Sequence, residues 1–453
     1  MGPWRNRCSS VLTGHINWNS LWDMRSDNCS RLNYLAAAVV LALIVALGAT
    51  LGCGGGQDQR TSENQSVIHF WQFWTEPEVR AVITKAVEEF EAANPEYRVE
   101  ITDLTWDGGH QKIVAAFAGD EVPDLLELGS DWIAEFADAG ALTDLTPEYE
   151  RLNAQYVGWP SAMYAGQCWA MPWYLSTRVL YQNDTLAWNL ALKPDRPPVI
   201  WDELLEWSAK ANRRKPNFFG FGVNAAERHR LYKKFLPFLW SAGGDILSED
   251  GSQCILDSPE GERALQFLVR LSKNGIIEKQ AVLDELFISG RLLYHFSGDW
   301  LHRRMKDMDL KFGYSVHVIP SPGPGEEKQI SFAGGEYLTI PRRAAQPVGA
   351  VKLARHLLST KNIFNLCIAT GCPTPVSIEV GNNPYFLQDP IRRVFLQQLV
   401  LSQSPPVHPK WVEIEAEIEW GVEQALYEKL PVTAALVQTC ERIDKILAAN
   451  PAK

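Results

Sequence analysis

The stretch VIHFWQFWTEPEVR, residues 67–80, contains a strand and the start of a helix. Val67 to Phe73 is rich in β-branched and aromatic residues, which favour strands. Thr75 is the expected helix N-cap, and Pro77 follows it in the first turn, where its missing N–H costs nothing. Apolar residues then recur at helical spacing as far as Phe90. A strand, a sharp turn and a helix form the first unit of an open α/β sheet.

The turn after this strand carries Trp74 and Glu76. Ligands of open α/β sheets bind beyond the carboxyl ends of the strands. Trp74 and Glu76 are therefore candidate ligand-binding residues. The alternative is a core tryptophan beside an ordinary helix cap.

The same pattern repeats along the first third of the chain. Strands are expected at 98–102 and 124–128, and helices at 109–118 and 132–139. This alternation predicts a parallel sheet flanked by helices. The two further strands end in polar and aromatic residues, which add candidates at the same edge of the sheet: Trp106, Asp107 and Asp131. For Asp131, capping of its own helix is an equal alternative.

The rest of the chain keeps an α/β pattern. Strands are expected at 167–173 and 179–183, separated by Tyr174 to Thr177. Pro- and Gly-rich segments interrupt the chain at 320–325 and 371–375. With 453 residues, the sequence is long enough for two domains with hydrophobic cores.

The N-terminal part of the sequence has the features of an export signal. Residues 35–51 are apolar and uncharged, and Arg25 and Arg31 precede them. The run is shorter than the roughly 20 residues of a membrane-spanning helix, and its flanks are those of a signal peptide. We expect a signal peptide at residues 1–52, with Met24 as an alternative translation start and an uncleaved anchor as the alternative interpretation.

The signal ends in Leu51-Gly52-Cys53, which resembles the lipobox of bacterial lipoproteins. In those proteins the cysteine is lipidated and becomes the first mature residue; here Thr50 replaces the usual leucine. Residues 53–65 are rich in glycine and polar residues, which favour a flexible tether. The resemblance implies that Cys53 carries a lipid and that the domain is exported, anchored at the outer face of the cytoplasmic membrane or in the periplasm.

Composition limits the classes of function. The formal net charge of −11 argues against nucleic acid as a partner. The 17 tryptophans favour an aromatic-lined pocket. No GxSxG, HExxH, P-loop or GxGxxG motif is present, and no Cys or His spacing suggests zinc. We therefore expect no enzyme, no metal site and no cofactor.

Five cysteines follow Cys53: Cys168, Cys254, Cys367, Cys372 and Cys440. An exported domain can hold disulfides, but an odd number leaves at least one thiol free. Cys367 and Cys372 are the favoured pair, because they lie at the end of one helix and in the turn beyond it. Buried free thiols are an equal alternative.

Several short motifs follow one another in a family-specific order: FEAANP (90–95), VPDL (122–125), YQND (181–184), WDEL (201–204), FSGDW (296–300), FAGGE (332–336) and GCPT (371–374). In this order they resemble the extracellular solute-binding proteins of family 1. These are the sugar-binding receptors of ABC importers, with maltose-binding protein as a distant relative. The resemblance covers essentially residues 67–447.

The resemblance implies an α/β two-lobe periplasmic-binding-protein fold of type II. Each lobe is an open, mostly parallel sheet flanked by helices, and hinge strands join the lobes. The expected limits are 66–173 and 331–376 for lobe 1, and 174–330 and 377–453 for lobe 2. The expected crossings lie near 173–175, 320–331 and 375–381, and the last two coincide with the Pro- and Gly-rich segments.

A sugar has an apolar C–H face and a rim of hydroxyls, so its receptors combine aromatic rings with carboxylates or amides. By family position, Trp300 after Asp299 implies an aromatic platform, with a buried core tryptophan as the alternative. Trp411 resembles a second stacking position, for which core packing is an equal alternative. Trp173 and Tyr174 stand at the first crossing, where they would contact the ligand or brace the crossing.

The segment Gly334-Gly335-Glu336 precedes another expected strand. Its glycines would let the backbone approach a ligand, although a β-bulge explains them equally well. Glu336 is the candidate carboxylate of this segment.

The leading interpretation is a lipid-anchored, monomeric receptor that captures a mono- or oligosaccharide between its lobes. It would deliver the sugar to the membrane-spanning subunits of an ABC permease, which work with a cytoplasmic ATPase. An enzyme that acts on cell-surface glycans, with carboxylates such as Asp107 and Glu336, and the sensing subunit of a signalling receptor are alternatives from other classes.

Two other solutes stay open within the binding class. A glycerol-phosphate receptor has little support, because Arg178 is the one arginine near a candidate turn. A cationic solute such as a polyamine would suit the acidic candidates: Glu76, Asp107, Asp131, Asp299 and Glu336.

Overall fold

The computed structural model describes residues 65–449, apart from 107, 120, 193–195, 215, 226, 307 and 327. The expected signal peptide, Cys53, the tether up to residue 64 and Asp107 therefore lie outside the described residues. Within the part of the chain that is described, no helix is long and apolar enough to cross a membrane.

The first sheet has the strand order β13-β12-β3-β1-β2, and β6 also pairs with β12. Its strands are β1 (Ser66–Gln72), β2 (Tyr97–Asp103), β3 (Leu125–Gly129), β6 (Met171–Thr177), β12 (Ser331–Thr339) and β13 (Ser402–Gln403). The strand β1 runs parallel to β2 and β3, as expected, whereas β12 is antiparallel to β3 and β6.

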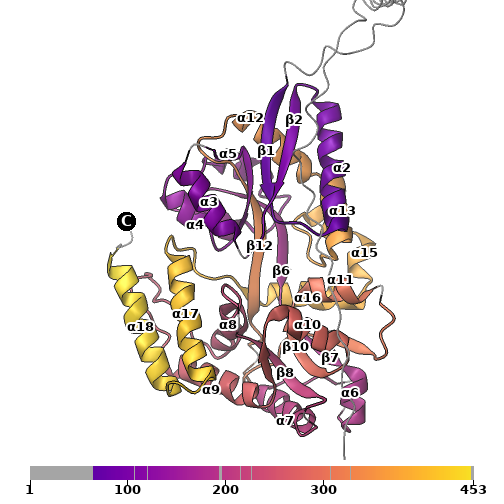
Figure 1. The fold of residues 1–453 in the computed structure, drawn as a ribbon, viewed down its shortest axis with the longest axis vertical. Coiled ribbons are helices and arrows are strands. Elements are labelled where there is room, and N and C mark those ends of the chain that lie inside the picture. The colour runs from indigo at the N-terminus through magenta and orange to yellow at the C-terminus, as the bar shows by residue number, and fades with distance from the viewer. Residues whose placement is uncertain are drawn as a thin grey trace, which may run out of the picture. The chain divides into compact units, whose positions relative to one another are not determined.

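Helices of residues 77–152 and 347–370 accompany the first sheet (Figure 1). They are α2 (Pro77–Ala93), α3 (Gly109–Ala118), α4 (Ile133–Asp138), α5 (Thr146–Leu152), α12 (Pro347–Leu357) and α13 (Thr360–Thr370). In α2 the buried residues include Val79, Ile83 and Phe90, which face one side at helical spacing. They pack with Phe70 of β1 in one hydrophobic core.

The second sheet has the strand order β11-β7-β10-β8-β9. Its strands are β7 (Val179–Asn183), β8 (Phe219–Asn224), β9 (Ile276–Glu278), β10 (Leu292–Ser297) and β11 (Tyr314–His317). The strand β8 is parallel to β9 and β10, and β7 is antiparallel to β10 and β11.

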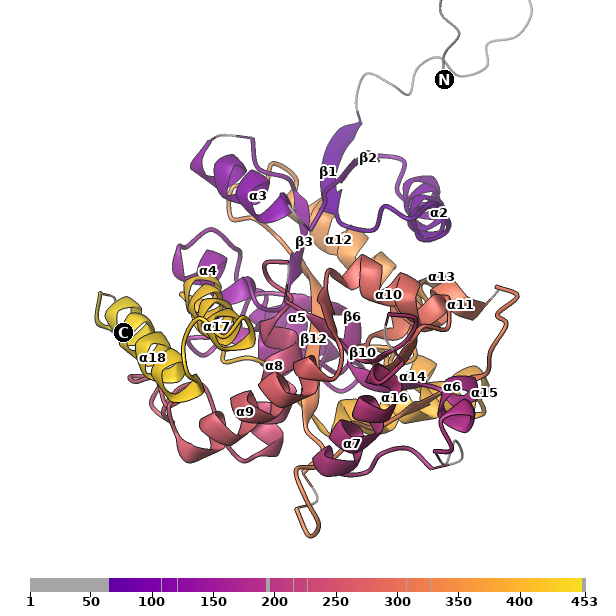
Figure 2. The same ribbon diagram turned by 60° about the horizontal axis from the view of Figure 1, so that its bottom comes forward.

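Helices of residues 184–306 and 390–449 accompany this sheet (Figure 2). They are α6 (Asp184–Asn189), α7 (Trp201–Asn212), α8 (Tyr232–Ser241), α9 (Pro259–Lys273), α10 (Gln280–Ile288), α11 (Asp299–Lys306), α16 (Pro390–Val400), α17 (Trp411–Leu426) and α18 (Val432–Ala449). Among them, α17 and α18 pack on α9. Short elements complete the fold: η1 (Trp159–Ala162), β4 (Met163–Tyr164), β5 (Gln167–Cys168), α14 (Ile378–Gly381) and α15 (Pro384–Leu387). The second sheet has a core of its own, to which Phe235, Phe267 and Phe296 belong.

The chain passes from the first sheet to the second between β6 and β7 and returns between β11 and β12. The strands β6 and β12 lie side by side in the ladder that includes Gly335 and Leu175 (Figure 1). The limits of the two lobes, and the hinge between them, stay predictions.

The sequence predicted Thr75 as the N-cap of α2, but in the structure the N-cap is Glu76. Glu76 is extended, with φ −63° and ψ 130°, and its carbonyl accepts the first helical hydrogen bond, from the Arg80 N–H at 2.9 Å. Pro77 explains the shift, because a residue that precedes proline is held out of the helical region.

Tyr174 to Thr177 form part of β6. The break between two strands that was expected at these four residues is therefore wrong. The polar side chains are paired inside the fold: Thr177 donates to the Phe332 carbonyl at 2.9 Å, and Thr374 donates to the Leu175 carbonyl at 2.8 Å. These contacts satisfy the polar groups without solvent.

The favoured disulfide pair is also wrong. Cys254 bonds with Cys440, whereas Cys367 and Cys372 are buried free thiols. The Cys372 sulfur lies 3.6 Å from the carbonyl oxygen of Leu175, so this thiol packs against β6.

Candidate ligand-binding site

Polar side chains of the two sheets meet where their strands end. Asp299 begins α11 directly after β10 and is 1% exposed. Its carboxylate accepts hydrogen bonds from the hydroxyls of Tyr174 and of Ser176, the latter at 2.8 Å, and both donors belong to β6. A carboxylate of the second sheet is thus held by hydroxyls of the first.

A second contact joins Asp131, after β3, to the start of α8. The Tyr232 hydroxyl donates to Asp131 at 2.6 Å, and the Lys233 ammonium lies 3.4 Å from the same carboxylate. Burial alone would raise the pKa of Asp131, but the Lys233 charge and the Tyr232 hydrogen bond outweigh it and hold this pKa below its usual value. Asp131 does not cap α4, which has no side-chain cap.

A third contact lies nearer the surface. Glu76 after β1, with 51% of its side chain exposed, pairs with Arg303 of α11 at 3.2 Å. Three separate contacts therefore bring candidate residues of both sheets together: Asp299, Asp131 and Glu76.

Aromatic rings lie beside these polar groups. Trp74 meets Tyr174 edge to face at a centroid distance of 4.9 Å. Trp106 is 37% exposed and stacks on Phe73 at 4.2 Å, and Trp132 lies 5.5 Å from it. This arrangement offers ring faces to a ligand with apolar C–H groups.

Four buried polar atoms at this end of the first sheet have no hydrogen-bond partner among the described residues. They are Nε1 of Trp74, Nε1 of Trp132, Oε1 of Glu127 and Oε2 of Glu336. Nearly all buried polar groups in proteins are hydrogen-bonded, so these four atoms are candidates for contacts with a ligand. The lack of a partner does not mark a site by itself, since core residues such as Trp411 and Tyr294 also carry unpaired atoms. Glu127 was not predicted as a site residue, because it stands inside a fully buried strand, where a carboxylate gives no periodic signal.

Glu336 stands opposite Gly129 of β3 in the antiparallel ladder. Burial, and after it the charge of Asp299, raises the pKa of Glu336 to about 8. Burial also raises the pKa of Glu127 well above its ordinary value, and the Glu336 charge adds to this effect. Glu336 is therefore largely protonated at neutral pH and able to donate as well as accept.

We expect Glu336→Gln to stabilise the protein at alkaline pH. Because the native pKa of about 8 exceeds the unfolded value of 4.5, the native state holds its proton more tightly, and wild-type stability falls as pH rises between these values. Glutamine removes this loss, so the variant should gain about 4–5 kcal/mol above pH 8 and little near pH 4.5.

Urea denaturation at several pH values measures this effect. Glu88→Gln, at an exposed position of α2, is the matched control and should keep the wild-type pH profile. A parallel pH profile for Glu336→Gln would contradict the prediction.

The glycines before Glu336 are explained by strand packing. A Cβ atom on Gly335 would lie 2.2 Å from the Tyr174 carbonyl oxygen, and one on Gly334 would lie 2.8 Å from the Phe332 ring. The ladder between β12 and β6 shifts its register between Glu336 and Tyr337. These contacts favour the β-bulge interpretation of the two glycines.

Trp300 is half-buried at the start of α11. Its indole N–H donates to Asp284 at 3.2 Å, and the Arg178 guanidinium lies 4.6 Å from the centroid of its ring. Trp411 is 1% exposed and lies in the second core, 5.6 Å from the Tyr232 ring, which favours core packing. Trp173 is likewise a core residue, 6.0 Å from Phe70.

No described arrangement offers an obvious catalytic group. Asp284, His295 and Ser297 lie close together, but the last two are fully buried, and Ser297 donates weakly to Asp284, at 3.5 Å, instead of to the histidine. Among the described residues, no group of His, Cys, Asp and Glu could hold a metal ion.

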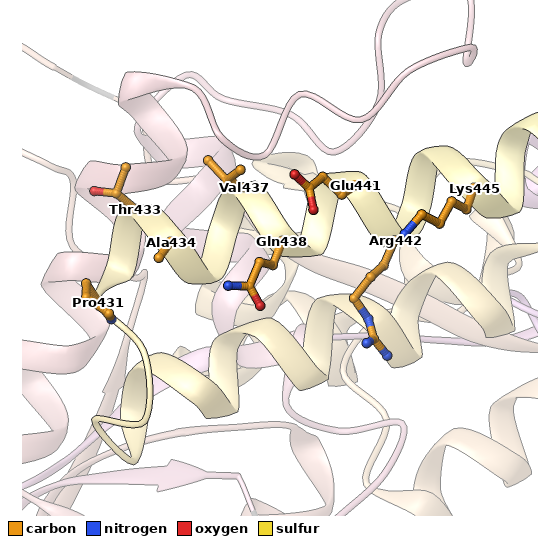
Figure 3. Close-up of a pocket in the computed structure, with 8 residues that line it drawn as sticks. All are labelled: Pro431, Thr433, Ala434, Val437, Gln438, Glu441, Arg442 and Lys445. Carbon is orange, nitrogen blue, oxygen red and sulfur yellow. The ribbon is translucent and has the colours of Figure 1, made fainter.

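Two surface pockets add little to this site. Figure 3 shows one, whose lining residues all come from α18 and the residues just before it and include no candidate. Another is small and is lined by Ser130, Asp131, Ala134, Ser161 and residues 404–408.

Residues 85–393 match the model of the family described as "Bacterial extracellular solute-binding protein", and the chain belongs to this family. It is a solute-binding protein of ABC transporters, and the proteins it resembles are binding proteins. Its fold is the two-lobe α/β fold of periplasmic binding proteins, as expected.

Three similar proteins illustrate the family. An ABC-transporter solute-binding protein from Thermotoga lettingae, solved with α-D-tagatose, is 26% identical, with a TM-score of 0.77 over 84% of this chain and 100% of that one. The maltotriose-binding protein of Pyrococcus abyssi is 24% identical over 78% of this chain and 76% of that protein. The sn-glycerol-3-phosphate-binding periplasmic protein UgpB of Shigella dysenteriae is 22% identical over 68% of this chain and 70% of that protein.

Proposed function

We propose that the protein binds a carbohydrate between the strand ends of its two sheets and delivers it to an ABC permease. The observation that carries this proposal is the group of four unpaired buried polar atoms among aromatic rings: those of Trp74, Trp132, Glu127 and Glu336. The ligands named for the Thermotoga and Pyrococcus proteins, α-D-tagatose and maltotriose, support the same class.

A sugar suits this set of groups because each hydroxyl both donates and accepts. The two indole N–H groups can donate to hydroxyl oxygens, and the two carboxyl oxygens can accept from hydroxyl hydrogens. The C–H face of a sugar can pack on rings such as the half-exposed Trp106. A mostly aromatic site with a few placed polar groups is the usual form of a small-molecule pocket.

The mechanism is a population shift. A solute that touches both sheets favours the conformation in which they are close, and the permease recognises that conformation. The contacts of Asp131 with Lys233 and of Glu76 with Arg303 already join the two sheets and would add to the same closed form. We also propose that the lipid on Cys53 keeps the receptor, as a monomer, near the permease.

A polyamine has less support than a sugar. Its ammonium groups need carboxylates that are free of other cations, but Asp131 and Glu76 are paired with Lys233 and Arg303. Asp299 is already held by two hydroxyls. The cationic alternative would therefore have to break contacts that the protein makes with itself.

A thermal-shift screen of wild-type protein against sugars, polyols and polyamines tests the class of ligand. A ligand at 100 times its dissociation constant adds about 2.7 kcal/mol of stability, which a melting curve shows clearly. Stabilisation by a polyamine and by no sugar would overturn the proposal.

We expect Trp74→Phe to weaken binding of the stabilising sugar about tenfold, because the variant keeps a ring and loses the unpaired N–H. Its melting temperature should stay near that of the wild type. Trp201→Phe is the matched control, since the Trp201 N–H donates to the Pro320 carbonyl at 3.2 Å in the second core. The control should melt earlier and bind normally; calorimetry that shows unchanged affinity for Trp74→Phe would argue against this contact.

A further inference from the structure

Arg178, between β6 and β7, has an unusual environment for a buried arginine. It is 8% exposed, and no carboxylate of the described residues lies within ion-pair distance of its guanidinium. Its described hydrogen bonds all leave from Nη1, to Ser176 Oγ at 3.1 Å and to the Thr177 carbonyl at 3.3 Å. A buried charge normally has a direct partner, because removing it from water is costly.

Two aromatic rings hold this guanidinium. Its central carbon lies 4.6 Å from the Trp300 ring centroid and 5.4 Å from the Phe332 ring centroid. Rings stabilise the charge through their faces and fix the plane of the group. The edge that carries Nε and Nη2 makes no hydrogen bond with a described residue and keeps the fork geometry that suits a planar anion.

No acidic group of the described residues forms a direct ion pair with Arg178. The charge of Asp299 acts on Arg178 from a distance, and the hydroxyl of Ser176 donates to Asp299 and accepts from Arg178. Glu336, with its pKa raised to about 8 by burial, is largely uncharged at neutral pH. The Lys233 ammonium lies 5.4 Å from the same Phe332 ring, but it is already paired with Asp131 at 3.4 Å.

We propose that Arg178 binds an anionic group on the solute, so that the preferred ligand is an acidic sugar. The anionic group is a carboxylate or a phosphate, which share the oxygen geometry that a guanidinium fork recognises. This inference rests on the proposed carbohydrate function and narrows it. In the bound state the sugar ring would lie beside Trp300 and its acidic group at the free edge of Arg178.

Matched ligands test the inference on the wild-type protein. Calorimetry at about pH 7 compares D-glucose, D-glucuronate and D-glucose 6-phosphate, which differ only at C6, and the corresponding galactose and mannose series. We expect at least one acid or phosphate to bind at least about tenfold more tightly than its neutral parent. Preference for the acid identifies a carboxylate as the source, and preference for the phosphate ester identifies a phosphate.

Variants of Arg178 then test whether this residue causes the preference for the anionic sugar. Arg178→Gln should raise the dissociation constant of the preferred anion about thirtyfold and that of the neutral parent less than about threefold. Arg178→Lys, which keeps the charge but loses the fork, should give an intermediate loss. Arg214→Gln is the matched control, because Arg214 is exposed at the end of α7 and donates to the Asn189 carbonyl.

The possible results distinguish failure of the anionic subsite from failure of the proposed carbohydrate function. A neutral sugar that binds as tightly as its acid and its phosphate overturns the anionic subsite and leaves the carbohydrate proposal in place. Failure of every sugar, neutral and charged, overturns both. If Arg178→Gln does not fold, the wild-type comparison and Arg178→Lys still decide, and equal losses for the anion and the neutral parent in Arg178→Lys would count against the subsite.

Discussion

Replacing both Cys254 and Cys440 by serine is expected to lower the free energy of unfolding by about 4 kcal/mol. The disulfide joins residues 186 positions apart and ties the segment before α9 to α18. A cross-link that closes so long a loop removes much of the conformational freedom of the unfolded chain. Chemical denaturation followed by circular dichroism measures the loss.

The reductant dithiothreitol supplies the control for this prediction. It should lower the stability of the wild-type protein to that of the double variant and leave the double variant unchanged. Cys168→Ser is a second control, since Cys168 is a buried free thiol and the variant should keep its sensitivity to reductant. A wild-type protein whose stability does not respond to reductant would contradict the disulfide.

This disulfide shows why local spacing misleads. Cys367 and Cys372 are close in sequence and so form the obvious pair, but proximity in sequence says nothing of where each thiol points. Cys254 and Cys440 come together only because α18 packs beside α9. Such pairing depends on tertiary packing, which no sequence period encodes.

The α/β order of the first half was predictable because side-chain periodicity reports which face of each element is buried. The helix expected at 109–118 has those bounds in the structure. The turn expected at Tyr174 to Thr177 was wrong because composition, and not periodicity, suggested it. Ser176 and Thr177 look like turn residues by composition, but partners elsewhere in the fold satisfy their hydroxyls and let the strand continue.

Some residues of the candidate site were predictable from the sequence, and others were not. The rule that ligands lie beyond strand ends predicted Trp74 and Asp131, and the family resemblance implied Asp299; the structure places all three in contacts at the strand ends. It could not predict Tyr232 and Lys233, because they begin a helix of the second region and reach Asp131 only through the packing of the two sheets. Whether these residues bind the solute stays a prediction.

Trp300→Ala is expected to raise the dissociation constant of the bound sugar about thirtyfold, equivalent to roughly 2 kcal/mol. The half-buried indole is held in place by its hydrogen bond to Asp284 and by the Arg178 guanidinium at 4.6 Å. A ring fixed in this way loses little freedom when a sugar packs on it, which is what makes aromatic residues effective in binding sites. Calorimetry with the best sugar of the screen measures the effect.

The same substitution should cost less stability than the loss of a core tryptophan. Truncating a fully buried aromatic side chain costs about 3–5 kcal/mol, and Trp300 is only partly buried, so we expect about 1–2 kcal/mol. A large drop in melting temperature with normal affinity would show that Trp300 is structural. Trp300→Phe should recover part of the affinity, because it keeps a smaller ring and loses the N–H that bonds Asp284.

Gly298→Ala tests the position of the ring while leaving Trp300 in the sequence. A Cβ atom on Gly298 would lie 2.0 Å from a carbon of the indole, so the ring must move away from its present place near Arg178. If the platform depends on that place, Gly298→Ala should weaken sugar binding in the same direction as Trp300→Ala. If affinity depends on the presence of the ring and not on its position, Gly298→Ala should bind sugar normally. That result would show that preorganisation of the indole is not the source of the binding energy.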